Sequence, residues 1–279
     1  MTRPPAPEPL PLPVVDGHAH FDHTRDGDQP SDVLQALAEA TAVNVTRAVQ
    51  IGCDLASARW TVQAVDLHPQ LLGGVSLHPT EAADHAGAPT ALADALAQIE
   101  ELAGHPRVRV VGETGLDHYW TGADDLAGRA AQVDSFRWHI ALAKRLGKVL
   151  QIHDRDAHDD VLRILADEGA PERTVFHCFS GDAAMARFCA DQGWYLSFAG
   201  TLTFKNAQSL RTALSAVPFD QVLVETDAPY LAPAPHRGRT NASYLIPITV
   251  RCMAEVLGRD LEGVCGQLGA TAEALYGPW

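Results

Sequence analysis

Long apolar runs and basic charge are both scarce in this sequence of 279 residues. It contains no apolar run of about 18 residues or more, which excludes a transmembrane helix, and we expect no membrane partner. Lys and Arg number 21 against 35 Asp and Glu, a formal net charge of −14. This balance argues against broad coating of nucleic acid by surface charge, although a nuclease needs only a local basic patch.

Paired cysteine spacing is also missing, because the five cysteines are scattered and form no CxxC motif. The first 13 residues are rich in proline and lack the apolar stretch of a secretory signal. An odd number of cysteines in such a chain indicates reduced thiols, and we expect a cytoplasmic protein.

No linker, repeat or low-complexity tract divides the sequence, so we expect one domain over residues 1–279, with 1–13 as an extended lead-in. Eight short runs rich in β-branched residues predict strands. They occupy 14–20, 46–52, 71–78, 108–113, 149–153, 174–180, 194–200 and 222–227.

Helical patterns fill gaps between these runs. Apolar residues three and four positions apart predict helices at 89–103 and at 129–146, where Gly147 follows as a C-cap. Further helical segments are 31–42, 158–168, 182–192, 206–216 and one or two within 243–276. Eight alternating units of strand and helix in one chain of this length predict a (β/α)8 TIM barrel. A doubly wound parallel sheet is the alternative architecture.

Histidines and carboxylates fall near the ends of the predicted strands. Asp16, His18 and His20 alternate along the first strand and therefore project from one face. Further along, Glu113 closes the fourth run, His153 ends the fifth, His177 lies in the sixth and Asp227 ends the eighth. The carboxyl ends of barrel strands converge on the face that carries active sites.

Four imidazoles and two carboxylates are too many ligands for one catalytic ion, but they suit two divalent ions. We therefore predict a binuclear metal site with six ligands: His18, His20, Glu113, His153, His177 and Asp227. Such a site generates a nucleophile from water at neutral pH. The imidazoles favour zinc or manganese, and the carboxylates also admit magnesium.

Several motifs together resemble the TatD family of metal-dependent hydrolases, within the amidohydrolase-like group of barrels. They are VVDGHAHFD at 14–22, SLHP at 76–79, GETGLD at 112–117, QIHDRDAHDD at 151–160, HCFSG at 177–181, TFKNA at 203–207 and ETDAPYLAPAPHRGRTN at 225–241. Gly17 departs from the Ser, Thr or Ala usual there, and no departure removes a ligand.

The resemblance implies that His18, His20, Glu113 and Asp227 hold one ion. It also implies that Glu113, His153 and His177 hold a second, with Glu113 bridging. It further implies a deoxyribonuclease, often a 3′–5′ exonuclease on single strands. In such an enzyme Asp227 accepts the proton of the attacking water. The predicted catalytic residues are therefore Asp227 and Glu113.

A phosphate substrate requires cations beyond the metal ions. His78 ends the third strand, Lys205 follows the seventh, and His236, Arg237 and Arg239 lie after the eighth. We predict that His78, Lys205 and Arg237 contact the substrate.

Other polar and aromatic residues near the strand ends have two interpretations each. Arg155 and Asp160 either orient the metal ligands or form a salt bridge at a helix start. Trp120, Phe179 and Tyr230 either stack a nucleobase or pack the loops.

Single-stranded DNA is the favoured substrate of a monomeric enzyme. Three alternatives remain open from the sequence: a D-aminoacyl-tRNA deacylase, a small-molecule amidohydrolase or lactonase, and a metal-bound scaffold without activity. The deacylase needs the same metal ions, so only its substrate distinguishes it. Lys205 and Arg237 suit phosphate better than a neutral amide.

Overall fold

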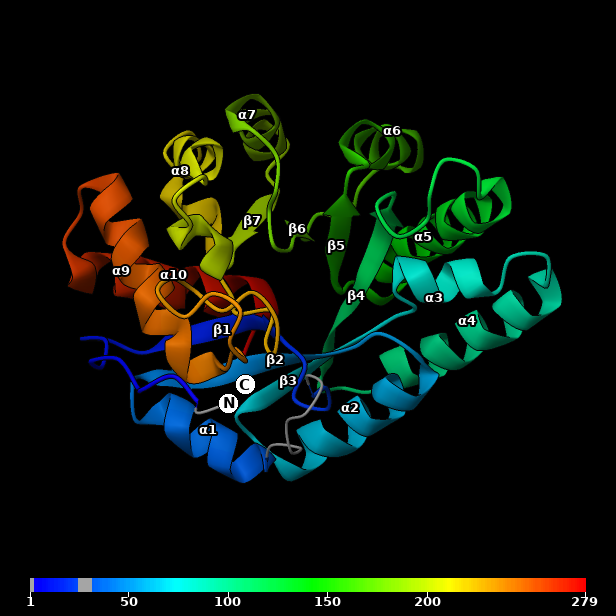
Figure 1. Ribbon diagram of the computed structural model, residues 1–279. Helices are drawn as coiled ribbons and strands as arrows, with labels where there is room; N and C mark the ends of the chain where they lie inside the picture. The colour runs from blue at the N-terminus through cyan, green and yellow to red at the C-terminus, as the bar shows by residue number, and fades with distance from the viewer. Residues whose placement is uncertain (1–2, 25–31) are drawn as a thin grey trace. The chain divides into compact units, whose positions relative to one another are not determined.

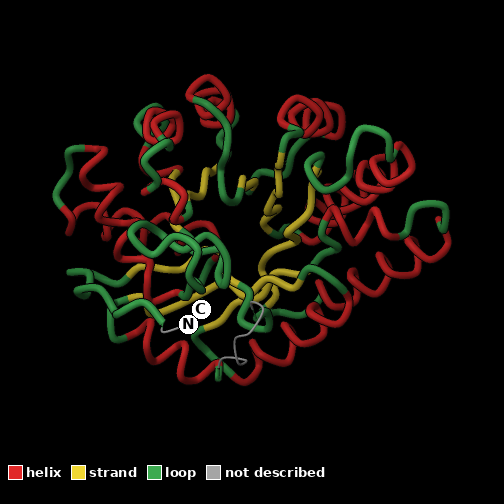
Figure 2. The backbone as a smooth tube through the Cα atoms, in the orientation of Figure 1, coloured by secondary structure: helices red, strands yellow, loops and turns green. Residues whose placement is uncertain are grey.

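The computed structural model describes residues 3–24 and 32–279, and its strands follow one another in the sheet in chain order, β1 to β8. Figure 2 shows strands alternating with helices along the chain. The strands are β1 (Val14–Ala19), β2 (Val45–Gly52), β3 (Leu71–Val75), β4 (Val108–Asp117), β5 (Val149–Arg155), β6 (Thr174–Phe176), β7 (Tyr195–Phe198) and β8 (Val222–Val224).

The helices are labelled in Figure 1. They are α1 (Val33–Thr41), α2 (Leu55–Leu67), α3 (Pro79–Asp84), α4 (Pro89–Ala103), α5 (Leu126–Leu146), α6 (His158–Glu168), α7 (Ala183–Asp191), α8 (Gln208–Leu214), α9 (Ile246–Leu257) and α10 (Leu261–Tyr276). Within the described ranges, no helix has the length and apolar content needed to span a membrane.

The chain divides into two compact units. Unit 1 comprises residues 1–50, 68–71 and 178–279, and unit 2 comprises 51–67 and 72–177. In unit 1, β1 pairs with β2 and β7 with β8, all parallel, and a parallel bridge joins Ala19 to Ala228. In unit 2, β3, β4, β5 and β6 pair successively and in parallel. A single domain over the whole chain stays a prediction.

The apolar stripes predicted for two helices are buried over most of their length, with Leu102 and Val133 only half-buried. Leu92, Leu96 and Ile99 of α4 are buried, and so are Phe136 and Ile140 of α5. Complete burial of such side chains contributes about 2–3 kcal/mol each. Helix α5 ends at Gly147, whose positive φ of 61° favours glycine at this C-cap.

Helix α2 has no counterpart among the predicted segments. Its buried positions are Ser57, Ala58, Thr61, Ala64 and Val65, which are mostly small or polar. The buried face of α2 therefore lacks the stripe of large apolar residues, three and four positions apart, that indicates an amphipathic helix in a sequence.

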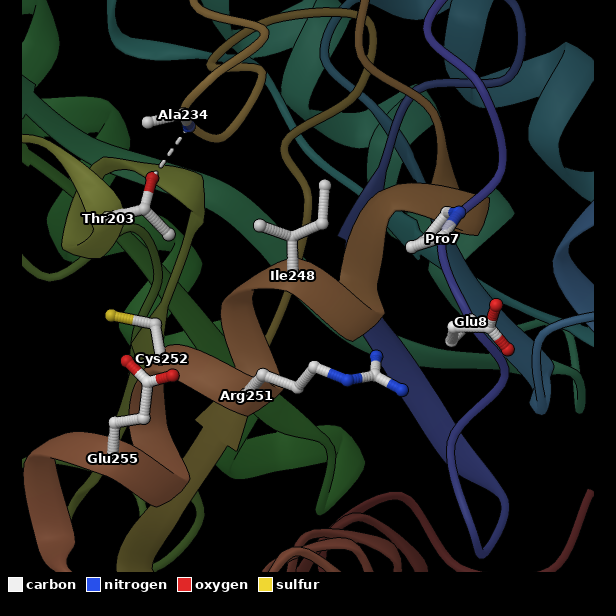
Figure 3. Close-up of a pocket in the computed structure, with 8 residues that line it drawn as sticks. All are labelled: Pro7, Glu8, Thr203, Ala234, Ile248, Arg251, Cys252 and Glu255. Carbon is white, nitrogen blue, oxygen red and sulfur yellow. Dashed lines mark hydrogen bonds between the residues drawn. The ribbon is translucent and has the colours of Figure 1, made fainter.

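The proline-rich lead-in is tied to unit 1 by hydrogen bonds. Tyr244 Oη donates to the Pro4 carbonyl at 2.7 Å, and Arg251 Nη2 donates to that of Pro9 at 3.0 Å. A pocket of about 460 Å³ lies beside residues 7–8 and α9 (Figure 3). None of the predicted metal ligands lines it: its walls are Pro7, Glu8, Thr203, Ala234, Ile248, Arg251, Cys252 and Glu255.

The buried His139 of α5 has a structural role. Its Nδ1 donates to the Ser135 carbonyl at 2.7 Å, and its Nε2 accepts from the Leu77 amide at 3.3 Å. Burial lowers the pKa of His139 to about 4, and the hydrogen bond to Ser135 only partly opposes this. Both ring nitrogens are therefore satisfied by the neutral imidazole.

We expect His139 to make stability depend on pH. His139 binds a proton below about pH 6.5 in the unfolded chain but only below about pH 4 in the folded chain. The unfolding free energy therefore falls as the pH falls from about 6.5 to about 4. The loss from this group is about 2 kcal/mol at pH 5. Urea unfolding at pH 7.5 and at pH 5 measures the unfolding free energy of the wild type and of His139→Gln. Between these two pH values, the free energy of the variant should fall less than that of the wild type. An equal loss in the variant would contradict the assignment.

Candidate metal centre

Unit 1 brings together three of the predicted ligands. His18 lies in β1 and His20 directly follows it, so the alternation of side chains along the extended chain puts both on one face. Their Nε2 atoms lie 3.1 Å apart, and Asp227 Oδ1 lies 3.7 Å from His18 Nε2 and 3.3 Å from His20 Nε2. Both imidazoles are buried. The three donors therefore converge on one point.

Asp16 ties β1 to the segment that carries Asp227. Its Oδ1 accepts from the Thr226 amide at 2.9 Å, and its Oδ2 accepts from Thr226 Oγ1 at 2.6 Å. Burial raises the pKa of Asp16 to about 6, while hydrogen bonds from Thr226 and Ser243 partly offset that effect. Asp16 thus fixes the spacing between the His18–His20 pair and Asp227.

Unit 2 brings together the other three predicted ligands. Glu113 Oε1 lies 2.5 Å from His153 Nδ1 and 2.9 Å from His177 Nε2, and these two nitrogens lie 3.4 Å apart. Glu113 is inside β4 rather than at its end, because β4 continues to Asp117 instead of stopping at residue 113. His177 directly follows β6.

Close packing of β4 against β5 holds Glu113 beside His153. Gly115 has a φ of 143°, and a Cβ at this position would overlap the carbonyl oxygen of His153. Only glycine therefore fits here without separating the two strands. The second glycine of the GETG motif has this steric function.

The Glu113 carboxyl is ionised in this setting. Burial by itself would raise its pKa, but the charges of His177 and His78 and hydrogen bonds from His153 and His177 hold the pKa well below its usual range. The Cys53 thiol adds a contact of 3.6 Å to Glu113 Oε2. A carboxylate held ionised among imidazoles is a suitable ligand for a cation.

Asp117 completes this cluster and was absent from the predicted site. Its Oδ2 lies 3.1 Å from His153 Nε2, the ring nitrogen that faces away from Glu113. The predicted strand ends at Glu113, which leaves Asp117 outside the predicted site. Its place in the GETGLD motif, four residues after Glu113, was the signal that could have identified it. A carboxylate on the outer nitrogen fixes the tautomer of a ligating histidine.

We expect Asp117→Asn to weaken metal binding about 10- to 100-fold. The amide can donate to His153 Nε2, which would place the ring proton on Nδ1 and remove the lone pair directed at Glu113. Titration of the metal-free protein with zinc measures the affinity independently of activity. Asp124→Asn, an exposed neighbour, is the control. Unchanged zinc affinity in Asp117→Asn would exclude the positioning role.

The donor sets of both units fit a divalent ion. Tetrahedral zinc with nitrogen ligands separates those ligands by about 3.3 Å, given metal–nitrogen bonds of about 2.0–2.1 Å. The nitrogen pairs here, at 3.1 Å in unit 1 and 3.4 Å in unit 2, match that edge. Within each set the donor atoms lie within 4.8 Å of one another. Bridging by Glu113 stays a prediction.

The predicted substrate contacts have different environments. His78 is half-buried, with its Nε2 3.5 Å from Glu113 Oε1 and its ring centroid 4.6 Å from that of His153. His78 is therefore part of the unit 2 cluster. Lys205 and Arg237 are exposed in unit 1, and the Arg237 guanidinium lies over the Phe204 ring at 4.6 Å.

Two further sequence interpretations are decided by contacts. Asp160 accepts a hydrogen bond from Arg163 at 2.8 Å within α6, so the salt bridge at a helix start holds for this residue. Phe179 is buried and packs against Phe198 with centroids 5.8 Å apart. Phe179 is therefore a packing residue. Within the described residues, no disulfide joins any of the five cysteines.

Comparison with known proteins identifies the family. The profile described as "TatD related DNase" matches residues 15–277. An uncharacterized metal-dependent hydrolase named TatD, from Mycobacterium tuberculosis, is 47% identical over 267 residues, covering 95% of this chain and 98% of its own. The chain belongs to the TatD family. The protein YabD of Bacillus subtilis, also an uncharacterized metal-dependent hydrolase, is 33% identical over 264 residues, covering 94% of this chain and 98% of its own.

A solved structure confirms the fold class. The crystal structure of the TatD homologue YjjV from Escherichia coli matches with a TM-score of 0.84 at 23% identity, covering 95% of this chain and 98% of its own. The predicted (β/α)8 architecture of the TatD family is therefore correct, and the doubly wound alternative is excluded. As a TatD-family member, the chain is a metal-dependent hydrolase.

Proposed function

We propose that this TatD-family hydrolase is a divalent-metal-dependent deoxyribonuclease that removes nucleotides from single-stranded DNA in the 3′–5′ direction. The observation that carries the proposal is the pair of donor sets, His18–His20–Asp227 and Glu113–His153–His177, each with two buried members and one half-buried member. The family description as a DNase supports the substrate class.

The six ligands have the residue types expected for two ions. When bound, divalent ions of this kind supply Lewis-acid activation of water and of a phosphoryl oxygen. Zinc, manganese and magnesium are the candidates, because imidazole favours the first two and carboxylate admits the third.

The chain's own residues hold and move the proton. Asp227 Oδ1 is the proton acceptor for the attacking water, since a carboxylate directed into a cluster of candidate ligands is well placed as a general base. The neighbouring His18 and His20 orient the Asp227 carboxylate, with their Nε2 atoms 3.7 and 3.3 Å from Asp227 Oδ1. Glu113 remains ionised throughout, because histidines surround it.

The cations of unit 1 bind the substrate's backbone. Arg237 and Lys205 are both exposed; Arg237 stacks on the Phe204 ring, and Lys205 directly follows Phe204 in the chain. A guanidinium offers paired donors that match phosphate geometry. This pair supplies local positive charge that the total of −14 conceals.

The test is digestion of end-labelled single-stranded DNA by the purified chain with magnesium or manganese. With a 5′ label we expect a ladder of shortened strands, and with a 3′ label immediate release of a labelled nucleotide. Chelator should stop the reaction, and added metal should restore it. Asp227→Asn should be inactive, while Asp220→Asn, an exposed carboxylate of the same unit, should digest normally.

Two results would contradict the proposal. Digestion by Asp227→Asn at the wild-type rate would show that the activity does not depend on the donor set that contains Asp227. Metal-loaded wild-type protein that leaves DNA intact would exclude the nuclease. D-aminoacyl-tRNA, assayed in parallel, would then reveal a deacylase by release of the amino acid.

A further inference from the structure

A cluster of exposed aromatic side chains follows β4 in unit 2. Tyr119 is 56% exposed and Trp120 is 68% exposed, and Leu126, the first residue of α5, is 75% exposed. Of the eight exposed large hydrophobic side chains in the described part of the chain, these three lie between the end of β4 and the start of α5. Large aromatic rings normally bury most of their surface, so adjacent exposed rings mark a contact surface.

Arg155, at the end of β5, joins the two rings. Its guanidinium lies over the Tyr119 ring, 3.9 Å from the centroid, and 5.8 Å from the centroid of Trp120. The two rings meet edge to face with centroids 5.1 Å apart. We call Tyr119, Trp120 and Arg155 the aromatic ledge. It combines a π surface with a permanent positive charge.

The ledge is anchored directly beside the metal ligands of unit 2. Asp117 Oδ1 accepts from the amides of Tyr119 and Trp120 at 3.0 and 2.8 Å, and the other carboxylate oxygen is 3.1 Å from His153 Nε2. One carboxylate thus positions both the ledge and a predicted ligand. Arg155 also lies two residues after His153 in β5.

A buried glutamine makes this loop rigid. Gln132 of α5 accepts from the Asp117 amide at 3.0 Å and donates to Thr121 Oγ1 at 2.6 Å. Both ends of the turn that carries Tyr119 and Trp120 are therefore fixed by one buried side chain. A rigid aromatic surface binds a flat ligand at low entropic cost.

We propose that the aromatic ledge stacks a nucleobase of single-stranded nucleic acid adjacent to the nucleotide being cleaved, with Trp120 as the stacking ring and Arg155 facing the strand's phosphate. The inference rests on the proposed function and names its base-binding subsite. A chain with a net charge of −14 gains little affinity from general phosphate neutralisation, so stacking must supply much of it. Stacking tolerates any sequence, as an exonuclease requires.

The experiment measures binding without cleavage. Anisotropy of a labelled thymidine oligomer is followed in chelator, against a strand of equal length in which the bases are replaced by abasic spacers. Trp120→Ala should weaken binding of the thymidine strand about 5- to 100-fold. Trp120→Phe should restore most of it, and Leu126→Ala, at an exposed position at the start of α5, should change it less than about twofold.

The abasic strand supplies the decisive comparison. It should bind the wild type more weakly than the thymidine strand, and Trp120→Ala should not weaken it further. Equal affinity of the wild type for both strands, or equal affinity of Trp120→Ala and the wild type for the thymidine strand, overturns the inference. Because Trp120 is exposed, an unchanged melting temperature is expected for its variants.

Failure of this subsite and failure of the proposed function give different results. Metal-dependent digestion of DNA that is unaffected by Trp120→Ala would retain the nuclease and overturn only the ledge. Base-dependent binding without any digestion would retain the ledge and overturn the nuclease.

Discussion

Asp227→Asn should lower the rate of DNA hydrolysis by about a thousandfold or more, with the fold unchanged. The carboxylate is the predicted proton acceptor and also one of three donors in its unit, so its loss removes general-base catalysis and weakens ion binding. Single-turnover digestion of labelled DNA under saturating manganese measures the effect, because saturation separates lost catalysis from lost affinity.

Asparagine is the appropriate replacement because Asp227 has a φ of 55°, a conformation that asparagine adopts far more readily than alanine. The hydrogen bond from its backbone amide to the His18 carbonyl, at 3.0 Å, is then retained. The matched control is Asp220→Asn, which should retain full activity. A rate for Asp227→Asn within tenfold of the wild type would rule out its role as base.

Glu113→Gln should remove metal from the protein as well as activity. The variant replaces an ionised carboxylate that lies 2.5 and 2.9 Å from two imidazole nitrogens with a neutral amide. We expect elemental analysis to show the loss of at least one ion per chain, and hydrolysis to fall on the order of a thousandfold. If Glu113 bridges two ions, both should be lost.

The number of ions lost by Glu113→Gln therefore tests the predicted bridge. Loss of one ion with retention of the other would assign Glu113 to a single site. Glu101→Gln, on the exposed side of α4, is the control and should retain the wild-type metal content. Full metal content in Glu113→Gln would contradict its assignment as a ligand.

The candidate ligands could be picked out because side-chain alternation and position along a strand are local properties of the sequence. His18 and His20 share a face for that reason alone, whereas the structure places His153 inside β5, which continues to Arg155, and His177 directly after β6. The stripes of α4 and α5 followed from apolar spacing in the same way.

Features that depend on contacts between distant segments could not be predicted. Strand β4 extends to Asp117 because Gly115 permits close pairing with β5, and the partner strand is not visible in the local sequence. Helix α2 was missed because its buried face consists of small and polar residues. The sequence predicts His78 as a substrate contact, and only the structure shows that its side chain lies beside Glu113.

By itself, the sequence determined the alternation of strands and helices, the residues able to bind metal, and the family to which they belong. Those properties depend on residue type and on short spacings. Tertiary structure alone decided that Asp16 fixes Asp227 through Thr226, that Asp117 supports His153, and that Arg155 lies on Tyr119 rather than on a metal ligand. Each of these contacts joins residues from different segments, and its geometry is set by how the intervening strands and helices pack.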